Sequence, residues 1–152
     1  MNYAEIPRDW ALCLTNGCPQ AANCLRHVSH VEWTKEATEH VCVLPQACRT
    51  DGHCPMFATK EPVTLAWGMR ELFSFIRNED EQRVRADLIK LFGDRRRFYR
   101  FREGRWVISP TMQEAIVAIL RKHGYTRPPK FDLTKQSVYF PGRTDYIFRL
   151  DA

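Results

Sequence analysis

Six cysteines are gathered in the first part of this 152-residue chain, and none occurs after residue 54. They form two groups of three with four or five residues between neighbours: Cys13, Cys18, Cys24, then Cys42, Cys48, Cys54. Four of the five histidines lie in the same stretch: His27, His30, His40 and His53. Thiolates and imidazoles are the ligands preferred by zinc and by softer metal ions. The clustering therefore predicts a metal site, and a metal cross-link would stabilise a segment with little periodic apolar sequence.

The rest of the sequence narrows the cellular setting that we expect. Residues 1–9 contain acidic side chains and lack the apolar run of a secretory signal. No stretch approaches the roughly 18 apolar residues of a membrane-spanning helix. We therefore expect a cytoplasmic protein without a membrane partner. Six cysteines in a reducing compartment seldom form disulfides, which leaves metal ligation, redox chemistry or simple burial.

The positive charge of the chain is concentrated in its second half. The formal net charge is +5. Between residues 77 and 130 there are fourteen Lys and Arg side chains and seven acidic ones, so the remainder of the chain is slightly acidic. Such a concentration of positive charge favours an anionic partner without demanding one.

Three segments of different character follow one another, and we expect them to form one compact unit. Residues 1–61 are the Cys-rich segment, in which one helix is predicted from Pro19 to about His30. Residues 62–124 are predicted to form a helix–helix–β-hairpin–helix core, and residues 125–152 a C-terminal strap. The predicted fold class is α+β, with a metal-stabilised N-terminal segment packed on that core.

Apolar periodicity and capping residues define the predicted elements of the core. A helix over 63–77 is predicted from four apolar side chains at helical spacing: Leu65, Met69, Leu72 and Ile76. Capping residues predict a second helix over 78–93 and a third over 109–124. In the strap, residues 137–140 and 146–148 are aromatic enough to form edge strands.

Residues 96–108 have a period of two and predict a hairpin that turns at Glu103 and Gly104. In this arrangement Arg102 faces Arg105, and a bound phosphate would relieve the repulsion between them. Five basic side chains are the predicted anion or nucleic-acid contacts: Arg96, Arg97, Arg100, Arg102 and Arg105. Aromatic residues interleaved with them suit stacking on bases. The same rings would also pack on the helices in a hairpin that binds nothing.

Several short motifs are shared with a known family. They are Cys13-Leu14, Cys18-Pro19-Gln20-Ala21, Cys24-Leu25-Arg26, Cys54-Pro55-Met56-Phe57, Phe92-Gly93, Arg97-Phe98-Tyr99-Arg100 and Ser109-Pro110-x-x-Gln113. Through them the chain resembles an uncharacterised Cys-rich family of unknown function from anaerobic gut bacteria, over most of its length up to about residue 133. The resemblance implies no activity. It does imply that Cys13, Cys18, Cys24 and Cys54 belong to the family pattern, whereas Cys42 and Cys48 are additions in this chain.

Four cysteines suit more than one kind of centre. The first hypothesis is a structural, tetrahedral zinc site with Cys13, Cys18, Cys24 and Cys54 as ligands. An iron–sulfur cluster also requires four thiolates, and buried or reactive thiols without a metal are a third interpretation. The sequence contains no His-Glu-x-x-His and no carboxylate two residues after His53, so these patterns of catalytic zinc sites are missing. Enzymatic activity is left open and is the less favoured interpretation.

Together these patterns favour a zinc-stabilised binding or regulatory module whose basic hairpin contacts nucleic acid. Residues 79–81 are all acidic and begin the second predicted helix, where DNA phosphates would repel them. We therefore expect contacts with the nucleic-acid backbone rather than base reading in the major groove. The alternatives are an iron–sulfur redox protein and an adaptor whose basic surface meets an acidic protein. The sequence does not define an oligomeric state.

Overall fold

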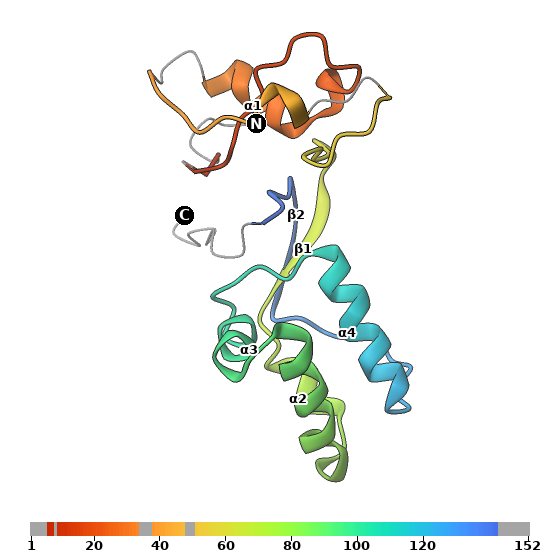
Figure 1. Ribbon diagram of the computed structural model, residues 1–152. Coiled ribbons are helices and arrows are strands. Elements are labelled where there is room, and N and C mark those ends of the chain that lie inside the picture. The colour runs from red at the N-terminus through yellow and green to blue at the C-terminus, as the bar shows by residue number, and fades with distance from the viewer. Residues whose placement is uncertain (1–5, 8, 34–37, 48–50, 143–152) are drawn as a thin grey trace. The chain divides into compact units, whose positions relative to one another are not determined.

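The computed structural model describes residues 6–7, 9–33, 38–47 and 51–142, and these form two compact units (Figure 1). The first unit comprises Met1–Pro62 and Val138–Gly142, and the second contains Val63–Ser137. The predicted α+β class is confirmed, since the described chain has four α-helices and one antiparallel pair of strands. None of the helices in this part of the chain combines the length and apolar character that a membrane span requires.

The first unit is built around helix α1 (Leu25–Trp33) and is largely irregular elsewhere. A 3₁₀ turn, Ala21–Asn23, precedes α1, and a second one covers Pro45–Ala47. Trp10 packs edge-to-face on Phe140, with ring centroids 5.2 Å apart, so residues 138–142 complete this unit. Both rings are buried, and they form its core together with Ile6, Leu12, Leu25 and Ala58.

The helix predicted from Pro19 is wrong in its start. Cys24 has an extended backbone (φ −90°, ψ 118°) and separates the 3₁₀ turn from α1. The cause lies in another part of the chain, because Cys24 forms an antiparallel bridge with Thr59. The Leu25 amide donates to the Ala58 carbonyl at 2.6 Å in the same bridge. A distant segment thus displaces the beginning of the helix by several residues.

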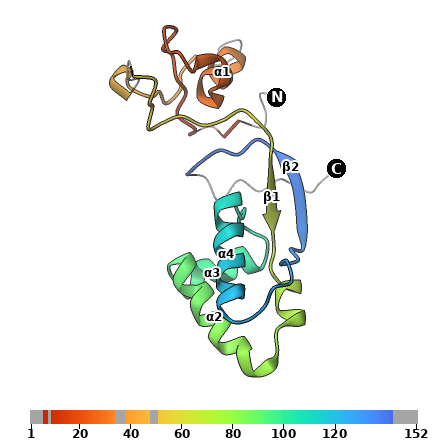
Figure 2. The same ribbon diagram turned by 90° about the vertical axis from the view of Figure 1, so that its right-hand side faces the viewer.

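The second unit combines a two-stranded sheet with three helices. Strand β1 (Val63–Trp67) pairs antiparallel with β2 (Leu133–Ser137) in the register Val63↔Ser137 to Trp67↔Leu133. Helices α2 (Asn78–Phe92), α3 (Arg95–Arg102) and α4 (Pro110–Lys122) lie on the same side of this pair in Figure 2. The fully buried side chains of this core include Leu72, Leu88, Phe98, Ile116 and Leu120.

Helices α2 and α4 confirm the second and third predicted helices. Helix α2 ends at Gly93, whose φ of 94° is in the left-handed region that favours glycine. At the start of α4 the Ser109 hydroxyl accepts a hydrogen bond from the Met112 amide at 3.3 Å, and Pro110 occupies the first turn. These capping interactions are local and could be predicted from the sequence. The start of α2 differs from the prediction, because Arg77 precedes the helix and no side chain caps it.

The helix predicted over 63–77 is wrong. Its four apolar residues are all buried, but Leu65 lies in β1 and Leu72 in a 3₁₀ helix, Glu71–Phe75. Gly68, with φ 74°, turns the chain between these elements. Strand β1 forms because β2, far away in sequence, supplies its hydrogen-bonding partner. The strand predicted over 137–140 therefore lies earlier, at 133–137, and the segment 146–148 lies outside the described residues.

The predicted hairpin over 96–108 is also wrong, because its first half is helix α3. The Asp94 carboxylate caps this helix by accepting from the Arg97 amide at 2.8 Å. Phe98 and Phe101, three residues apart, are buried on one face of the helix. Gly104, with φ 76°, follows the C-terminus of the helix instead of forming a hairpin tip. Arg102 and Arg105 therefore do not face each other across a hairpin.

Candidate metal centre and basic helix

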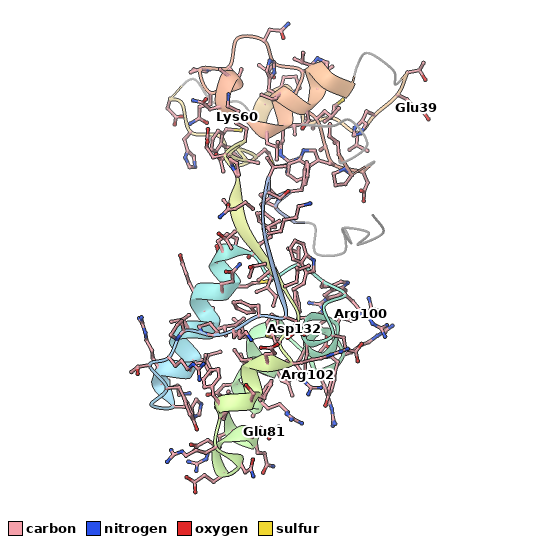
Figure 3. The ribbon with its side chains drawn as sticks, turned by 180° about the vertical axis from the view of Figure 1, so that it is seen from behind. Glu39, Lys60, Glu81, Arg100, Arg102 and Asp132 are labelled. Carbon is pink, nitrogen blue, oxygen red and sulfur yellow. The ribbon has the colours of Figure 1, made fainter. Side chains whose placement is uncertain are left out.

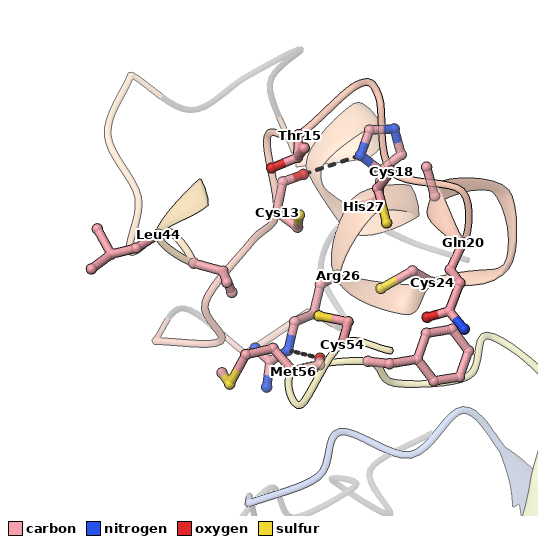
Figure 4. Close-up of a pocket in the computed structure, with 13 residues that line it drawn as sticks. Cys13, Thr15, Cys18, Gln20, Cys24, Arg26, His27, Leu44, Cys54 and Met56 are labelled. Carbon is pink, nitrogen blue, oxygen red and sulfur yellow. Dashed lines mark hydrogen bonds between the residues drawn. The ribbon is translucent and has the colours of Figure 1, made fainter. Parts of the chain in front are cut away.

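The four cysteines predicted as metal ligands line a single cavity in the first unit. Figure 4 shows the side chains of Cys13, Cys18, Cys24 and Cys54 around a common space, although they come from separate turns of the chain. The free volume at its centre is about 10 Å³. That is close to the space required by one water-sized sphere. The cavity is therefore narrow, and cysteine is the commonest residue type in its wall.

Local hydrogen bonds fix the backbone of each cysteine. The carbonyls of Cys18 and Cys54 accept from the amides of Ala21 (3.1 Å) and Phe57 (3.0 Å), so each of these cysteines opens a tight turn. In each turn the next residue is proline, which suits the second position of a turn because its φ is fixed. The Cys-Pro dipeptides of the sequence are thus two turns that lead into the cavity.

Cys13 and Cys24 are held by the first turn of α1. The Cys24 carbonyl accepts from the amides of His27 and Val28, at 3.1 and 3.0 Å. The Cys13 amide donates to the Arg26 carbonyl at 3.2 Å, and the Cys13 carbonyl lies 3.2 Å from Nδ1 of His27. In the tautomer with the proton on Nδ1, this nitrogen donates to the Cys13 carbonyl, and Nε2 of His27 is a hydrogen-bond acceptor. Hydrogen bonds to the first turn of α1 therefore fix the backbone positions of two of the four cysteines.

A buried arginine lies beside the thiols. Arg26 is 8% exposed, and its Nε and Nη1 donate to the carbonyls of Met56 (2.8 Å) and Ala11 (2.7 Å). Its guanidinium carbon lies 3.6 Å from the centre of the Trp10 ring. Burial lowers the pKa of Arg26, and the thiols of Cys24, Cys54 and Cys13 act in the opposite direction.

None of the described residues supplies a carboxylate to Arg26. A buried charge is costly unless an opposite charge compensates it. Deprotonated thiols would provide that compensation. Sequence reasoning gave Arg26 no role, although its place between Cys24 and His27 was the available signal.

Of the other metal-ligand candidates that the structure describes, His27 alone lines the cavity. Cys42 is exposed, and its Sγ lies 3.5 Å from the His40 carbonyl oxygen. Cys48 lies outside the described residues. Within the described ranges, no three Cys, His, Asp or Glu side chains are arranged to hold a metal ion as they stand. In the described structure the four thiols thus line one cavity without forming a ligand group.

The predicted arginines lie on and just after α3, and Figure 3 shows Arg100 and Arg102 along this helix. Arg96 and Arg97 are exposed in its first turn, and Arg97 is 3.5 Å from Asp94. The Arg105 Nε is 2.9 Å from a Glu103 carboxylate oxygen. These two ion pairs are exposed and add little stability. Most of the guanidinium groups therefore face solvent with their charge only partly compensated.

Two further arginines, which sequence reasoning missed, lie near Tyr99. A hydrogen bond from Arg95 lowers the pKa of the Tyr99 hydroxyl, and the charges of Arg85 and Arg102 act in the same direction against partial burial. Arg85 and Arg102 each have a buried Nε without a hydrogen-bond partner among the described atoms. Arg95 lies four residues before Tyr99, so this contact follows once the segment is known to be helical.

The fold and the cavity together define a small α+β protein with a cysteine-lined cavity in one unit and a basic helix in the other. Residues 1–139 match the model of a family of unknown function, DUF6078, and the chain belongs to this family. No curated protein and no solved structure matches the chain. The resemblance to an uncharacterised family is thereby confirmed.

Proposed function

We propose that this protein is a zinc-stabilised binding module that contacts nucleic acid through helix α3. The observation that carries the metal assignment is the convergence of Cys13, Cys18, Cys24 and Cys54 on one cavity beside Arg26. Four thiolates around Zn²⁺ carry a net charge of −2, and the buried guanidinium would offset part of that charge. Metal binding would keep the four thiols deprotonated, and these thiolates would be the anionic neighbours of Arg26, which has no carboxylate partner among the described residues.

The dimensions of the cavity favour a single ion over a cluster. A central volume of about 10 Å³ suits one atom. Zinc binds four thiolates in tetrahedral geometry in closed structural sites. An iron–sulfur centre would need more room between the same cysteines, so the redox protein remains the second candidate. We also infer a reducing, cytoplasmic location, which agrees with cysteines that are free in the described structure.

Metal analysis of the purified full chain tests this assignment. We expect one zinc per chain, loss of zinc in the Cys24→Ser variant and full zinc content in Cys42→Ser, the matched control. Loss of metal should also unfold the first unit, because ligation and folding are coupled in such sites. A brown protein containing iron would support the cluster instead. Equal zinc content in wild type and Cys24→Ser would refute the proposed ligand set.

The nucleic-acid part of the proposal is supported by the charge on α3. Arg96, Arg97 and Arg100 lie within two turns of helix, and the acidic residues near them, Asp94 and Glu103, are fewer. Several guanidinium groups on one short helix suit contacts with successive phosphates. The second candidate partner is an acidic protein, which the same charges would also attract.

Salt dependence of binding distinguishes phosphate contacts from other contacts. We expect affinity for RNA or DNA to fall steeply with salt, and the log–log slope to decrease by roughly 0.7 to 0.9 for each phosphate that is no longer neutralised. The Arg96→Gln/Arg100→Gln variant should flatten the slope. Arg121→Gln/Arg127→Gln removes the same charge away from α3 and should change it less. Equal slopes for the two variants would contradict a role for α3, and no binding at low salt would favour the acidic-protein partner.

A further inference from the structure

The second unit contains a cleft of about 420 Å³ beside α3. Its wall includes three aromatic side chains, Phe92, Phe101 and Trp106, and two aliphatic ones, Leu91 and Met112. Arg97 also lines it and is largely exposed. The volume falls within the roughly 300 to 1,000 Å³ that is typical of small-ligand sites. The cleft therefore combines an aromatic and aliphatic wall with a basic side chain.

The aromatic wall of the cleft contains buried rings and one ring that is partly exposed to solvent. Phe92 and Phe101 are buried and stacked, with centroids 4.4 Å apart. Phe101 contacts Trp106 edge-on at 5.3 Å, and Trp106 is only half-buried. The guanidinium of Arg100 lies 4.9 Å from the centre of the Trp106 ring. Arg100 thus covers one face of the indole, and a planar ligand in the cleft could stack on the part of the Trp106 ring that Arg100 leaves uncovered.

We propose that this cleft receives an unpaired nucleobase, so that the protein prefers single-stranded nucleic acid. This inference rests on the proposed nucleic-acid function and adds the kind of nucleic acid. Arginines that contact phosphates next to an aromatic platform are the usual components of single-strand sites. Here Arg97 and Arg100 flank the cleft, and Trp106 is the platform. A paired base in a duplex is stacked on its neighbours and could enter only after being flipped out.

Charge complementarity decides between this occupant and an apolar peptide. Among the residues that the structure describes, the ionisable side chains at the cleft are Arg97, which lines it and is partly compensated by Asp94, and Arg100, which contacts Trp106. An apolar peptide gains nothing from these charges, and an acidic peptide would leave the aromatic wall uncovered. A nucleotide combines a planar apolar base with a negative phosphate and complements both features.

The test uses the purified full chain with a fluorescein-labelled 12-nucleotide single strand and the same sequence as a duplex. We expect tighter binding of the single strand and quenching of tryptophan fluorescence that is lost in Trp106→Phe. Trp106→Ala should weaken single-strand binding roughly ten-fold or more, because the stacking of one base is removed, and should leave duplex binding nearly unchanged. Trp106→Phe keeps an aromatic platform and should retain most of the affinity.

A second pair of variants guards against misfolding of Trp106→Ala. Leu91 is 37% exposed, so Leu91→Glu places a carboxylate in the cleft at small cost and should also weaken single-strand binding. Ala86→Glu adds the same charge elsewhere on α2 and should have a smaller effect. The cleft proposal would be overturned if the protein bound single strand and duplex equally well and Trp106→Ala changed neither affinity. Nucleic-acid binding itself would then still stand. The cleft proposal would also be overturned, in favour of a protein partner, if the protein bound polyglutamate and Trp106→Ala weakened this binding as much as it weakened single-strand binding.

Discussion

Replacing Gly68 by alanine should destabilise the second unit strongly. Gly68 follows β1 with φ 74°, and a Cβ atom there would lie 2.2 Å from an Asp132 carboxylate oxygen. That carboxylate accepts hydrogen bonds from the amides of Arg70 (2.9 Å) and Glu71 (3.2 Å), at the start of the 3₁₀ helix after β1. The new methyl group would have to displace the carboxylate and break both hydrogen bonds.

The expected loss of unfolding free energy in Gly68→Ala has two parts. A non-glycine residue in the left-handed region costs roughly 1–2 kcal/mol. The two broken hydrogen bonds add about 0.5–1.5 kcal/mol each. The free energy of unfolding should therefore fall by about 3 kcal/mol. Gly124→Ala is the matched control, because Gly124 has φ 84° and no atom within 4 Å of the added Cβ, so only the first part applies.

Urea denaturation followed by circular dichroism measures both variants. Asp132→Ala removes the same two hydrogen bonds, so the double variant with Gly68→Ala should cost less than the sum of the single changes. Equal costs for Gly68→Ala and Gly124→Ala would refute the role assigned to Asp132. Strict additivity in the double variant would show that the two residues act independently.

Two further predictions concern carboxylates of α2. The Asp87 carboxylate accepts from Lys122 and His123, which hold its pKa well below its usual value. Its stabilising effect is therefore present above about pH 4 and is lost as the pH falls toward the lower folded-state pKa. Asp87→Asn should reduce the loss of stability between about pH 6 and pH 3 in urea titrations, and an unchanged loss would count against the assignment. Tyr125→Phe removes the hydroxyl that donates to Asp80 at 2.7 Å and should lower the unfolding free energy by about 1–2 kcal/mol in the same assay.

The elements that could be predicted from sequence are those with local signals. Helix α4 has a serine cap and a proline in its first turn, and its apolar face is regular. Strand β1 could not be distinguished from a helix, because its partner, β2, is about half the chain away. Helix α3 could not be distinguished from a strand, because alternating arginines and aromatic residues fit both periods over a short span. Asp94, three residues before Arg97, was the overlooked capping signal.

The candidate sites, like the helices and strands, could be predicted only where the signal is local or compositional. The four cysteines that line the cavity could be grouped from their residue type and the family resemblance, and the fold brings them together. Arg26 could not be assigned to the cavity, because its position depends on carbonyls at residues 11 and 56, in segments far from it in sequence. The aromatic cleft could not be predicted from the sequence either. It forms only when α3 is helical, because Phe101 then contacts both Phe92 and Trp106.

The return of residues 138–142 to the first unit sets an order of assembly during synthesis. All cysteines and α1 emerge from the ribosome early, but the ring that covers Trp10 is Phe140, which emerges only after the whole of Val63–Ser137. Domains tend to fold as their segments become available. The second unit can therefore close its sheet before the first unit acquires its last core residue. A chain that ended before Val138 would contain both strands and the three helices of the second unit, whereas its first unit would lack Phe140.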